Sequence, residues 1–317
     1  MEIWRGKKVF ITGGTGTFGR HLVQHLLEQD SGVERVIVYS RDEMKQYEMN
    51  LRYGNEPRLQ FIIGDVREAS HLLRTMKDAD IVIHAAALKQ VPLGEFHPEE
   101  FIKTNILGTE NVIHAAIQHG VRQVVSLSTS KSVAPLNLYG ATKLCADKLI
   151  IGANRFSQVT RLATVRFGNI FGSRGSVVPL FLMKKAEGVL PVTHPDMTRF
   201  SITVRDMMAM ITTALGVMKG GEIFVPKCAS YRIGDLAQAV DAHCSLKIIG
   251  LRPGEKMHEE MIVPEEARFT CAYDGYYVIY PAVPPEEINR LVPPDFAYLS
   301  HTNSDVLTVA DLMQMLS

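Results

Sequence analysis

Short apolar runs alternate with helical patterns through the first half of the chain. The runs are rich in valine, isoleucine and phenylalanine, and they lie at 7–12, 34–39, 59–63, 81–87, 123–127 and 162–167. Apolar runs of this length predict strands that are buried on both faces of a parallel sheet. After the first run, Leu22, Val23, Leu26 and Leu27 recur at helical spacing. The repeated strand–helix alternation predicts an α/β fold with a doubly wound parallel Rossmann sheet.

Beyond residue 168 the alternation weakens and loops become more frequent. Helical patterns remain at 205–218, where we interpret the methionines as core residues, and at 234–242. The prolines between 281 and 294 predict little regular structure there. Thr308 and Asp311 have the spacing of a capping box, with aspartate in place of glutamate, and predict a last helix.

The composition excludes several classes of protein. The 317 residues are 46% hydrophobic and 21% charged, with a formal net charge of zero, so nucleic acid and anionic membranes are poor partners. No apolar stretch reaches the roughly 18 residues of a membrane span, and the N-terminus leads into a strand without a signal-peptide pattern. We therefore expect a cytoplasmic protein. The four cysteines lack CxxC spacing and His258 has no second ligand nearby in sequence, so we expect no metal site.

A glycine-rich turn follows the first predicted strand with the spacing GxxGxxG. Gly13 permits a tight turn, Gly16 lets the backbone approach a pyrophosphate, and Gly19 lets the next helix pack on the strand. Phosphate oxygens would then meet the free N–H groups of that helix's N-terminus. A bare glycine triplet can also mark only a turn, but this position favours a dinucleotide site. The expected cofactor contacts in the turn are Gly13, Thr15, Gly16, Thr17, Phe18 and Gly19.

The end of the second strand favours NADP over NAD. Ser40, Arg41 and Lys45 offer a hydroxyl and two cations, which suit a 2′-phosphate. The alternative is a solvated run of charges, and Asp42 keeps NAD open. We expect Ser40, Arg41 and Lys45 to contact the cofactor.

The third and fourth strands end in further candidates for the site. Asp65, followed by Val66, could accept a hydrogen bond from the adenine amino group, or it could cap the next helix. Ala85 and Ala86 are small enough for the backbone to approach the cofactor. Lys89 follows them toward the expected site.

In the next helical segment, Asn105 is a candidate to brace the backbone of the site.

Hydroxyl groups and a lysine cluster after the fifth strand, in the stretch 128–143. Open α/β sheets bind ligands at the carboxyl ends of their strands. Tyr139 and Lys143 lie four residues apart on a predicted helix, so they share a face. A lysine cation favours the phenolate, which makes Tyr139 a candidate base for a hydroxyl proton as hydride leaves for a nicotinamide. Surface residues at this spacing are the alternative.

Together these motifs resemble the extended short-chain dehydrogenase/reductase superfamily. Within it, the chain resembles the inverting UDP-N-acetylglucosamine 4,6-dehydratases of pseudaminic acid and related sugar biosynthesis. The resemblance implies a UDP-N-acetylhexosamine substrate and a homo-oligomer. It covers nearly the whole chain, and the matching phrases are 40–46, 84–92, 137–143, 166–176, 197–200 and 252–259.

The resemblance also implies a chemistry through a 4-keto sugar. Tyr139 would be the base at O4, with Thr129 hydrogen-bonded to O4 and Lys143 as the electrostatic partner and ribose ligand. Lys131 would be the base at C5, and inversion at C5 would follow. Ser130 departs from the family pattern, which has an aspartate there as the acid for the 6-hydroxyl. A serine has no useful proton acidity near neutral pH.

Several alternatives remain open. Another acid could serve, or the enzyme could form or process a 5,6-ene UDP-sugar. The chain could also epimerise C5 or C4 through the ketone, or it could be a non-catalytic NADP-binding protein. Ser130 could finally be a tolerated variation or a deliberate substitution.

The matching phrases, most of them in the second half, supply the expected substrate ligands. Arginines pair with phosphate oxygens bidentately, which favours a role for them at the UDP pyrophosphate. The expected substrate contacts are Lys89, Asn169, Arg199, Arg252 and, for the uridine ribose, Glu255.

We predict two regions. Residues 1–168 form the NADP-binding Rossmann domain, and 169–317 form a smaller region that mainly binds the substrate. Segments near 201–219 and 232–250 are expected to pack back onto the first domain.

Overall fold

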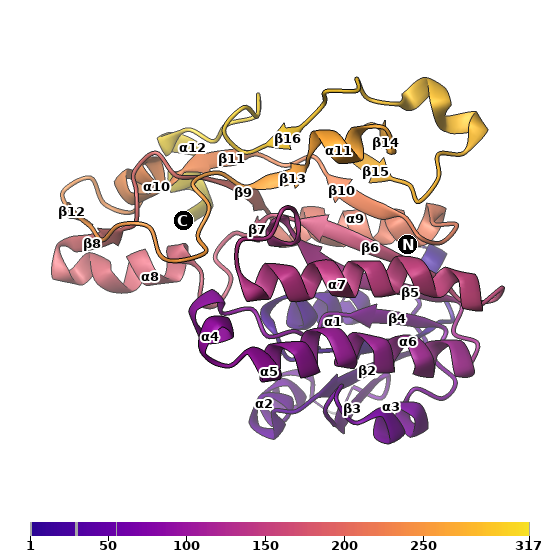
Figure 1. Cartoon of the computed structure of the whole chain (residues 1–317). Helices are drawn as coiled ribbons and strands as arrows, with labels where there is room; N and C mark the ends of the chain where they lie inside the picture. The colour runs from indigo at the N-terminus through magenta and orange to yellow at the C-terminus, as the bar shows by residue number, and fades with distance from the viewer. Residues whose placement is uncertain (1, 29–30, 55, 317) are drawn as a thin grey trace.

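The computed structural model describes residues 2–28, 31–54 and 56–316 (Figure 1). In this part of the chain one sheet has nine strands, in the order β14-β15-β10-β6-β5-β4-β1-β2-β3. The strands are parallel from β3 to β10, whereas β15 and β14 run antiparallel at one edge. Their bounds are β1 Lys8–Thr12, β2 Arg35–Ser40, β3 Leu59–Ile63, β4 Ile81–His84, β5 Gln123–Thr129, β6 Arg161–Phe167, β10 Ile223–Pro226, β14 Thr270–Ala272 and β15 Tyr276–Ile279.

The predicted fold class is confirmed, because the strand order is that of a doubly wound Rossmann sheet. The order reverses between β1 and β4, and ligands bind such sheets at that point, outside the carboxyl ends of the strands. Each of the six predicted strands is present. The fourth strand ends at His84, three residues earlier than predicted, because the alanines after it bend away as a loop.

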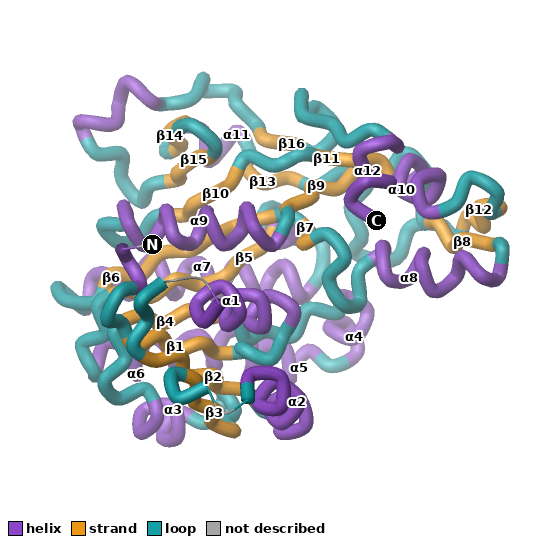
Figure 2. Tube along the Cα trace, turned by 180° about the vertical axis from the view of Figure 1, so that it is seen from behind, coloured by secondary structure: helices purple, strands orange, loops and turns teal. Residues whose placement is uncertain are grey.

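Helices cover both faces of the sheet, as Figures 1 and 2 show from opposite sides. One core lies between the sheet and the first layer, and a second core lies between the sheet and the other layer. The first layer contains α1 Thr17–Glu28, α2 Glu43–Tyr53 and α9 Val204–Val217. The other layer contains α3 Ala69–Thr75, α6 Gly108–Gln118 and α7 Leu138–Ala153.

A smaller lobe has its own core, in which Phe181, Leu236 and Leu312 are fully buried. Its elements are α8 Val177–Lys184, β8 Val189–Val192, β11 Ser230–Arg232, α10 Ile233–Val240, β12 Ser245–Ile248 and α12 Val309–Leu316. Four short strands between this lobe and the large sheet place apolar residues in the core of the first layer: β7 Asn169–Ile170, β9 Thr198–Ile202, β13 Glu260–Ile262 and β16 Tyr298–Leu299. The remaining helical pieces are short: η1 Glu2–Trp4, α4 Val91–Phe96, α5 Pro98–Phe101, the π-helix η2 Ile102–Leu107, η3 Ser130–Ser132, η4 Asn154–Phe156, η5 Lys185–Glu187, α11 Pro264–Ala267 and η6 Pro285–Arg290.

The two regions divide less simply than the sequence predicts. Helix α9 packs on the Rossmann sheet as expected, and β10, β14 and β15 also join this sheet although they come after residue 168. In contrast, α10 packs mainly on α8 and α12 in the smaller lobe, so the expectation for the segment near 232–250 is wrong. The apolar face of α10 finds its partners there because α8 and α12 present leucine and phenylalanine side chains to it.

A buried ion pair ties the later segments to the sheet. Arg166 on β6 is 1% exposed, and its guanidinium donates to both carboxylate oxygens of Glu266 at 2.9–3.0 Å. It also donates to the carbonyl of Met261 at 2.9 Å.

The capping box of the last helix is present, since Asp311 accepts from the backbone of Thr308 at 2.8 Å and its N–H donates to the Thr308 hydroxyl. Among the described helices, none combines the length and apolarity that a bilayer crossing requires.

Candidate active site

The glycine turn after β1 forms a backbone cradle that side chains would fill. Gly13 has φ +68°, and a Cβ on it would lie 2.8 Å from the Cα of Ala86. A Cβ on Gly19 would lie 2.4 Å from the Cα of Gly14. The turn therefore lies against the alanines after β4 and opens α1 at Thr17, as a pyrophosphate site requires. These residues fit a dinucleotide.

Two residues of the turn differ in how they can contribute. Thr15 and Phe18 are each 6% exposed, and the Phe18 ring belongs to the core between the sheet and α1. The Phe18 side chain therefore anchors the turn to this core, and only the Phe18 backbone remains a candidate cofactor contact.

Charged residues at the end of β2 pair largely with one another. Ser40 is buried and accepts a hydrogen bond from Gln46 at 3.0 Å. Asp42 caps α2 by accepting from the backbone of Lys45 and forms an ion pair with its ammonium. Arg41 is half exposed and lies 3.6 Å from Asp65. Of the three residues predicted to contact a 2′-phosphate, Ser40, Arg41 and Lys45, Arg41 is therefore the most accessible.

The side chain of Asp65 pairs with an arginine and does not cap helix α3. Its carboxylate accepts from the guanidinium of Arg67 at 2.6 and 2.8 Å and from the Arg67 backbone at 3.0 Å. Burial raises the pKa of Asp65, but these bonds and the charges of Arg67 and Arg41 lower it overall. The N-cap of α3 is Glu68, so the capping alternative for Asp65 is wrong. Val66 beside it is buried.

Asn105 braces the loop after β4, as predicted. Its side-chain oxygen accepts from the N–H of Leu88 at 2.8 Å, and its amide donates to the Leu88 carbonyl at 2.9 Å and to Thr142 at 3.0 Å. Asn105 lies on the π-helical turn η2, and such turns occur often at functional sites. The brace joins the loop that carries Lys89 to the helix that carries Tyr139.

The predicted catalytic hydroxyls meet at the carboxyl end of β5. Thr129 ends the strand, and its side chain accepts from the backbone N–H of Lys131. Asn137 caps α7 by accepting from the N–H of Gly140 at 2.8 Å, which places Tyr139 in the first turn. The Thr129 side chain also lies near enough to the Tyr139 phenol to lower its pKa. Thr129 at the end of the strand and Tyr139 at the start of the helix thus bring their hydroxyl groups together.

The pKa of Tyr139 differs from the prediction. Burial raises it to about 12, while the hydrogen bond with Thr129 lowers it and the charge of Asp147 raises it. The YxxxK spacing predicted a phenol that ionises more easily because of Lys143. Burial instead decides the direction in which this pKa moves.

Lys143 has a buried carboxylate near it, that of Asp147, which the sequence did not lead us to expect. Burial lowers the pKa of Lys143, and Asp147, one turn later on α7, raises it. Asp147 is 1% exposed and accepts from the hydroxyls of Ser128 at 2.7 Å and Ser132 at 3.1 Å. The i+4 spacing from Lys143 was the available signal for Asp147. Its burial raises its own pKa, against the opposing charges of Arg166 and Lys143.

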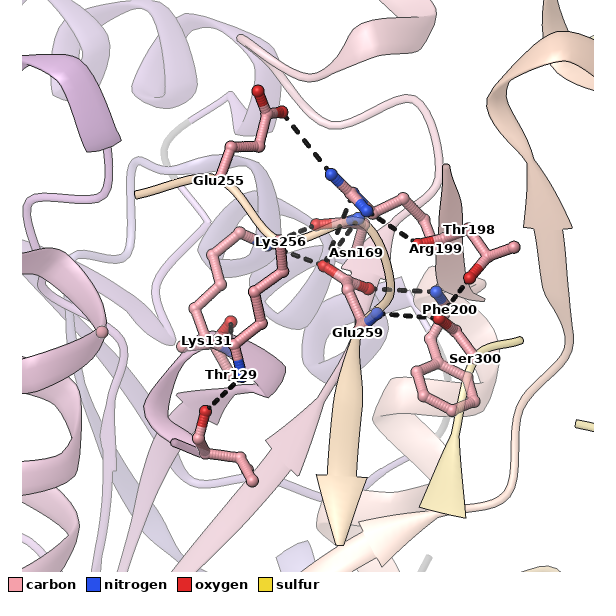
Figure 3. A network of polar contacts seen from close by, with 12 residues as sticks. Thr129, Lys131, Asn169, Thr198, Arg199, Phe200, Glu255, Lys256, Glu259 and Ser300 are labelled. Atoms are coloured by element: carbon pink, nitrogen blue, oxygen red, sulfur yellow. Dashed lines mark hydrogen bonds and ion pairs between the residues drawn. The ribbon is translucent and has the colours of Figure 1, made fainter. Parts of the chain in front are cut away.

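Figure 3 shows the ion pair that dominates the other side of the site. Lys131 donates to a carboxylate oxygen of Glu259 at 2.9 Å and to the side-chain oxygen of Asn169 at 3.2 Å. The second Glu259 oxygen accepts from the N–H of Phe200 at 3.0 Å, and Arg199 lies 3.9 Å from the first. Burial raises the pKa of Glu259, but Lys131, Arg199 and the hydrogen bonds lower it overall.

Glu259 is a site residue that the sequence reasoning did not assign. It ends the phrase 252–259 but comes from 128 residues beyond Lys131, so no local spacing could reveal the contact. Its side chain is 4% exposed, and a charge buried this far needs partners.

The predicted substrate ligands are only partly brought together. Asn169, Arg199 and Glu255 lie in one network with Lys131, and Glu255 is 3.5 Å from the Arg199 guanidinium. Arg199 is 8% exposed and donates mainly to backbone carbonyls, which makes it less available to a phosphate than predicted.

Two further cations lie at the edge of this network. Lys89 donates to the carbonyl of Arg174 at 3.0 Å. Although much of Lys89 is exposed, burial around its ammonium and then the charge of Lys131 lower its pKa. Arg252 is exposed on the loop before β13. His258 bonds Thr198, and within the described ranges no group of three His, Cys, Asp or Glu side chains could hold a metal ion.

Comparison with known proteins places the chain in a family. The model of the family described as polysaccharide biosynthesis proteins matches residues 9–281. The chain belongs to this family. The inverting UDP-N-acetylglucosamine 4,6-dehydratase of Campylobacter jejuni serotype O:2 is 47% identical over 281 residues, which cover 87% of this chain and 84% of that protein.

Two further proteins are similar to the chain over most of its length. A UDP-glucose 4-epimerase of Rickettsia felis is 40% identical over 86% of this chain and 82% of its own length. The solved structure of Pen from Bacillus thuringiensis superposes with a TM-score of 0.91 at 33% identity and covers 99% of both chains. The fold and the resemblance to inverting dehydratases are thereby confirmed.

Against this family background, Ser130 remains the departure from the expected pattern. It opens the short η3 turn between Thr129 and Lys131 and is 1% exposed. Its hydroxyl oxygen is buried without a hydrogen-bond partner in the described chain. The site therefore has a phenol, an amine and a carboxylate with partners, and at position 130 a buried hydroxyl with none.

Proposed function

We propose that this protein is an NADP-dependent UDP-N-acetylglucosamine 4,6-dehydratase that inverts C5 through a 4-keto sugar. The observation that carries the proposal is the convergence of Thr129, Tyr139 and Lys131 at the carboxyl end of β5. It occurs in a chain that is 47% identical to an enzyme of that name. An oxidising base and a separate amine are what such a reaction requires of a protein.

Oxidation at C4 rests on Tyr139. Its phenolate takes the proton of the 4-hydroxyl, while Thr129 hydrogen-bonds the same oxygen. NADP, held by the glycine turn after β1 and by Arg41, would supply the hydride-transfer chemistry between C4 and C6. Burial raises the pKa of Tyr139 to about 12, so its ionisation in the reaction must be assisted. Lys143, buried one turn further on α7, supplies the cation for that assistance.

Loss of the 6-hydroxyl rests on the other side of the site. The 4-ketone acidifies the hydrogen at C5, and Lys131 accepts this proton as an amine. The 6-hydroxyl then leaves, and protonation at C5 from the opposite face inverts that carbon. Ser130 offers no acidic proton to the leaving hydroxyl, so this step is the slow one in our proposal.

NADP rather than NAD is part of the proposal, with Arg41 as the residue that selects it. Replacing Arg41 with alanine removes a charge-assisted bond to a 2′-phosphate, worth about 1.5–3 kcal/mol. We expect NADP affinity to fall roughly 10- to 100-fold, with NAD affinity nearly unchanged. Arg35→Ala, at the exposed opposite end of β2, is the matched control. Equal losses for both cofactors in a binding titration would contradict the assignment.

The remaining expectations belong to the same proposal. Arg199 and Arg252 would bind the UDP pyrophosphate and Glu255 the uridine ribose, with Lys89 and Asn169 near the sugar. A homo-oligomer, a cytoplasmic location and a step in pseudaminic acid-type biosynthesis follow from the resemblance to the dehydratases.

The test incubates the purified protein with UDP-N-acetylglucosamine in heavy water and follows the products by NMR. A 4-keto-6-deoxy sugar labelled at C5 is the expected product. A product that keeps its 6-hydroxyl, with label at C5, would replace dehydration with epimerisation.

Epimerisation is the second candidate because a relative 40% identical to the chain is named UDP-glucose 4-epimerase and because Ser130 weakens the acid. Absence of turnover would lead to the same assay with a 5,6-ene UDP-sugar. Absence of any C5 or C4 exchange with UDP-hexosamines would favour a non-catalytic NADP-binding protein.

A further inference from the structure

A buried hydrogen-bond network lies at the point where the strand order of the sheet reverses. Thr12 ends β1 and His84 ends β4, and the two residues are register partners on these neighbouring strands. The Thr12 hydroxyl oxygen and Nδ1 of His84 are 2.7 Å apart, and Nε2 of His84 lies 3.0 Å from the Thr109 hydroxyl on α6. All three side chains are at most 1% exposed. Because ligands bind open α/β sheets at this point, the network lies next to the expected cofactor.

The partners of His84 determine which of its nitrogens carries the hydrogen. The Thr109 hydroxyl donates to the carbonyl of Asn105 at 2.7 Å, so toward His84 it can only accept, and Nε2 is the donor. Burial, and then the charge of Lys143, lower the pKa of His84 to about 3. The ring is therefore uncharged near neutral pH, and Nδ1 has a free electron pair. The Thr12 hydroxyl donates to that electron pair, so each bond of the network has one direction.

One end of the network holds the loop that lies against the glycine turn. The Thr12 hydroxyl, which donates to the histidine, accepts from the N–H of Ala86 at 3.3 Å. The Thr12 carbonyl accepts from the N–H of Ala85 at 3.2 Å. Ala86 packs so closely on Gly13 that a Cβ added to this glycine would lie 2.8 Å from the Ala86 Cα. The position of Ala86 therefore helps to set the shape of the cradle that we propose for NADP.

The other end of the network reaches the helix that carries the proposed base. Asn105, whose carbonyl accepts from Thr109, donates through its side-chain amide to the Thr142 hydroxyl at 3.0 Å. Thr142 in turn donates to the carbonyl of Tyr139 at 2.8 Å. Asn105 and Thr142 are each 1% exposed, so water does not compete for these bonds. The network thus extends from the cofactor turn to the first turn of α7.

We propose that His84, with its hydrogen on Nε2, is the positioning residue that joins the cofactor turn to the catalytic helix. Its ring accepts on one side and donates on the other, so it holds the loop after β4 and the first turn of α7 in a fixed relation. Hydride transfer needs the nicotinamide and the Tyr139 phenol at the same sugar carbon, and a small misplacement of either slows the reaction. The inference rests on the proposed function, because it assumes that NADP and Tyr139 act together.

Two substitutions separate the two bonds of His84. In His84→Asn, the amide oxygen takes the place of Nδ1 and still accepts from Thr12, while Thr109 loses its donor. In His84→Gln, the amide nitrogen reaches the place of Nε2 and still donates to Thr109, while the Thr12 hydroxyl loses its acceptor. His119→Asn is the matched control, because His119 bonds the carbonyl of Leu73 at 2.6 Å at the opposite end of α6.

The test measures cofactor binding and hydride transfer separately. NADP affinity is obtained by titration. Hydride transfer is followed by the absorbance of NADPH after rapid mixing of the NADP-saturated protein with UDP-N-acetylglucosamine. Because loss of the 6-hydroxyl is the slow step in our proposal, NADPH accumulates before it is consumed.

The two variants should fail in different ways. We expect His84→Gln to weaken NADP binding about tenfold, which is the order of one buried hydrogen bond, and to change hydride transfer at saturating NADP less than about twofold. His84→Asn should do the reverse and slow hydride transfer about tenfold with nearly unchanged NADP affinity. His119→Asn should match the wild type in both measurements.

A measurement on the wild type needs no substitution and survives if the variants do not fold. With isotope-labelled histidine, NMR should show the hydrogen of His84 on Nε2 and no titration between about pH 5 and 8. A hydrogen on Nδ1, or a titration near the ordinary pKa of 6.5, would overturn the inference.

The outcomes separate the inference from the proposed function. If both His84 variants lose NADP affinity and hydride transfer to the same extent, the histidine only fills the core, and the inference fails while the dehydratase stands. If the wild type itself forms no NADPH from the sugar nucleotide, the proposed function fails and the inference fails with it.

Discussion

Introducing a carboxyl group at position 130 should accelerate loss of the 6-hydroxyl. Ser130 is 1% exposed and its hydroxyl has no partner among the described residues, so Ser130→Asp would bury a carboxyl group next to the reacting sugar. Burial raises the pKa of a carboxyl, which keeps a proton available near neutral pH. Lys131 would oppose this effect, but its ion pair with Glu259 at 2.9 Å weakens that opposition.

The magnitude follows from what an acid supplies. General acid catalysis contributes about 10²–10⁴-fold in rate. We expect the lower limit, about 10²-fold, because the residual charge of Lys131 favours the ionised form of the new carboxyl. The larger side chain in a closed site should at the same time destabilise the fold by about 1–3 kcal/mol.

The assay measures the C6 methyl signal of the product by NMR under single-turnover conditions. Formation of the 4-ketone is followed in the same samples, because Tyr139 and Thr129 are untouched by the substitution. Ser130→Asn is the matched control, since asparagine has the shape of aspartate and no acidic proton.

Two results would refute the reasoning. The first is a folded Ser130→Asp protein that still forms the ketone but loses the 6-hydroxyl no faster than the wild type. The second is an equal gain in Ser130→Asn, because shape rather than a proton would then explain it.

Two further perturbations test the fold that supports the site. Gly19→Ala places a Cβ 2.4 Å from the backbone of Gly14, so we expect a loss of about 1–3 kcal/mol in unfolding free energy together with weaker NADP binding; Gly216→Ala, with nothing within 4 Å on α9, should instead gain about 0.5–1 kcal/mol, and calorimetry with cofactor titration compares them. Burial, and then the charge of Lys143, lower the pKa of His84 to about 3, below the 6.5 of the unfolded chain, so its contribution to stability is complete above pH 6.5 and is lost as pH falls toward 3. Urea unfolding should show about 2 kcal/mol less loss between pH 7 and 5 in His84→Asn than in the wild type, and equal losses would contradict the assignment.

Local patterns in the sequence determine most of the sheet and half of the site. The strands are predicted correctly because each is a short apolar run, and the apolar residues themselves indicate that the strand is buried. The glycine turn and the Tyr139–Lys143 pair are equally local, since a turn or one helical period fixes their geometry. The brace made by Asn105 was also foreseen, from its place after β4.

Tertiary contacts account for what the sequence did not reveal. The joining of Lys131 to Glu259 depends on how β13 returns to the site, which no spacing encodes. Arg199 looked like a free phosphate ligand, but the fold surrounds it with backbone carbonyls. The pKa of Tyr139 rises rather than falls because the depth of the site, invisible in the YxxxK spacing, decides the balance.

This division has a consequence for how the two half-reactions can fail. The groups that we propose for oxidation at C4 lie within 129–143, on one strand end and one helix, so they persist as long as the Rossmann sheet does. The proposed C5 base, Lys131, pairs instead with Glu259, which comes from the segment just before β13 and outside this stretch. Destabilisation of the contacts that hold this segment should therefore slow C5 exchange before it slows formation of the ketone. A chain in which both activities disappear together on urea titration would show that the two steps share one cooperative unit.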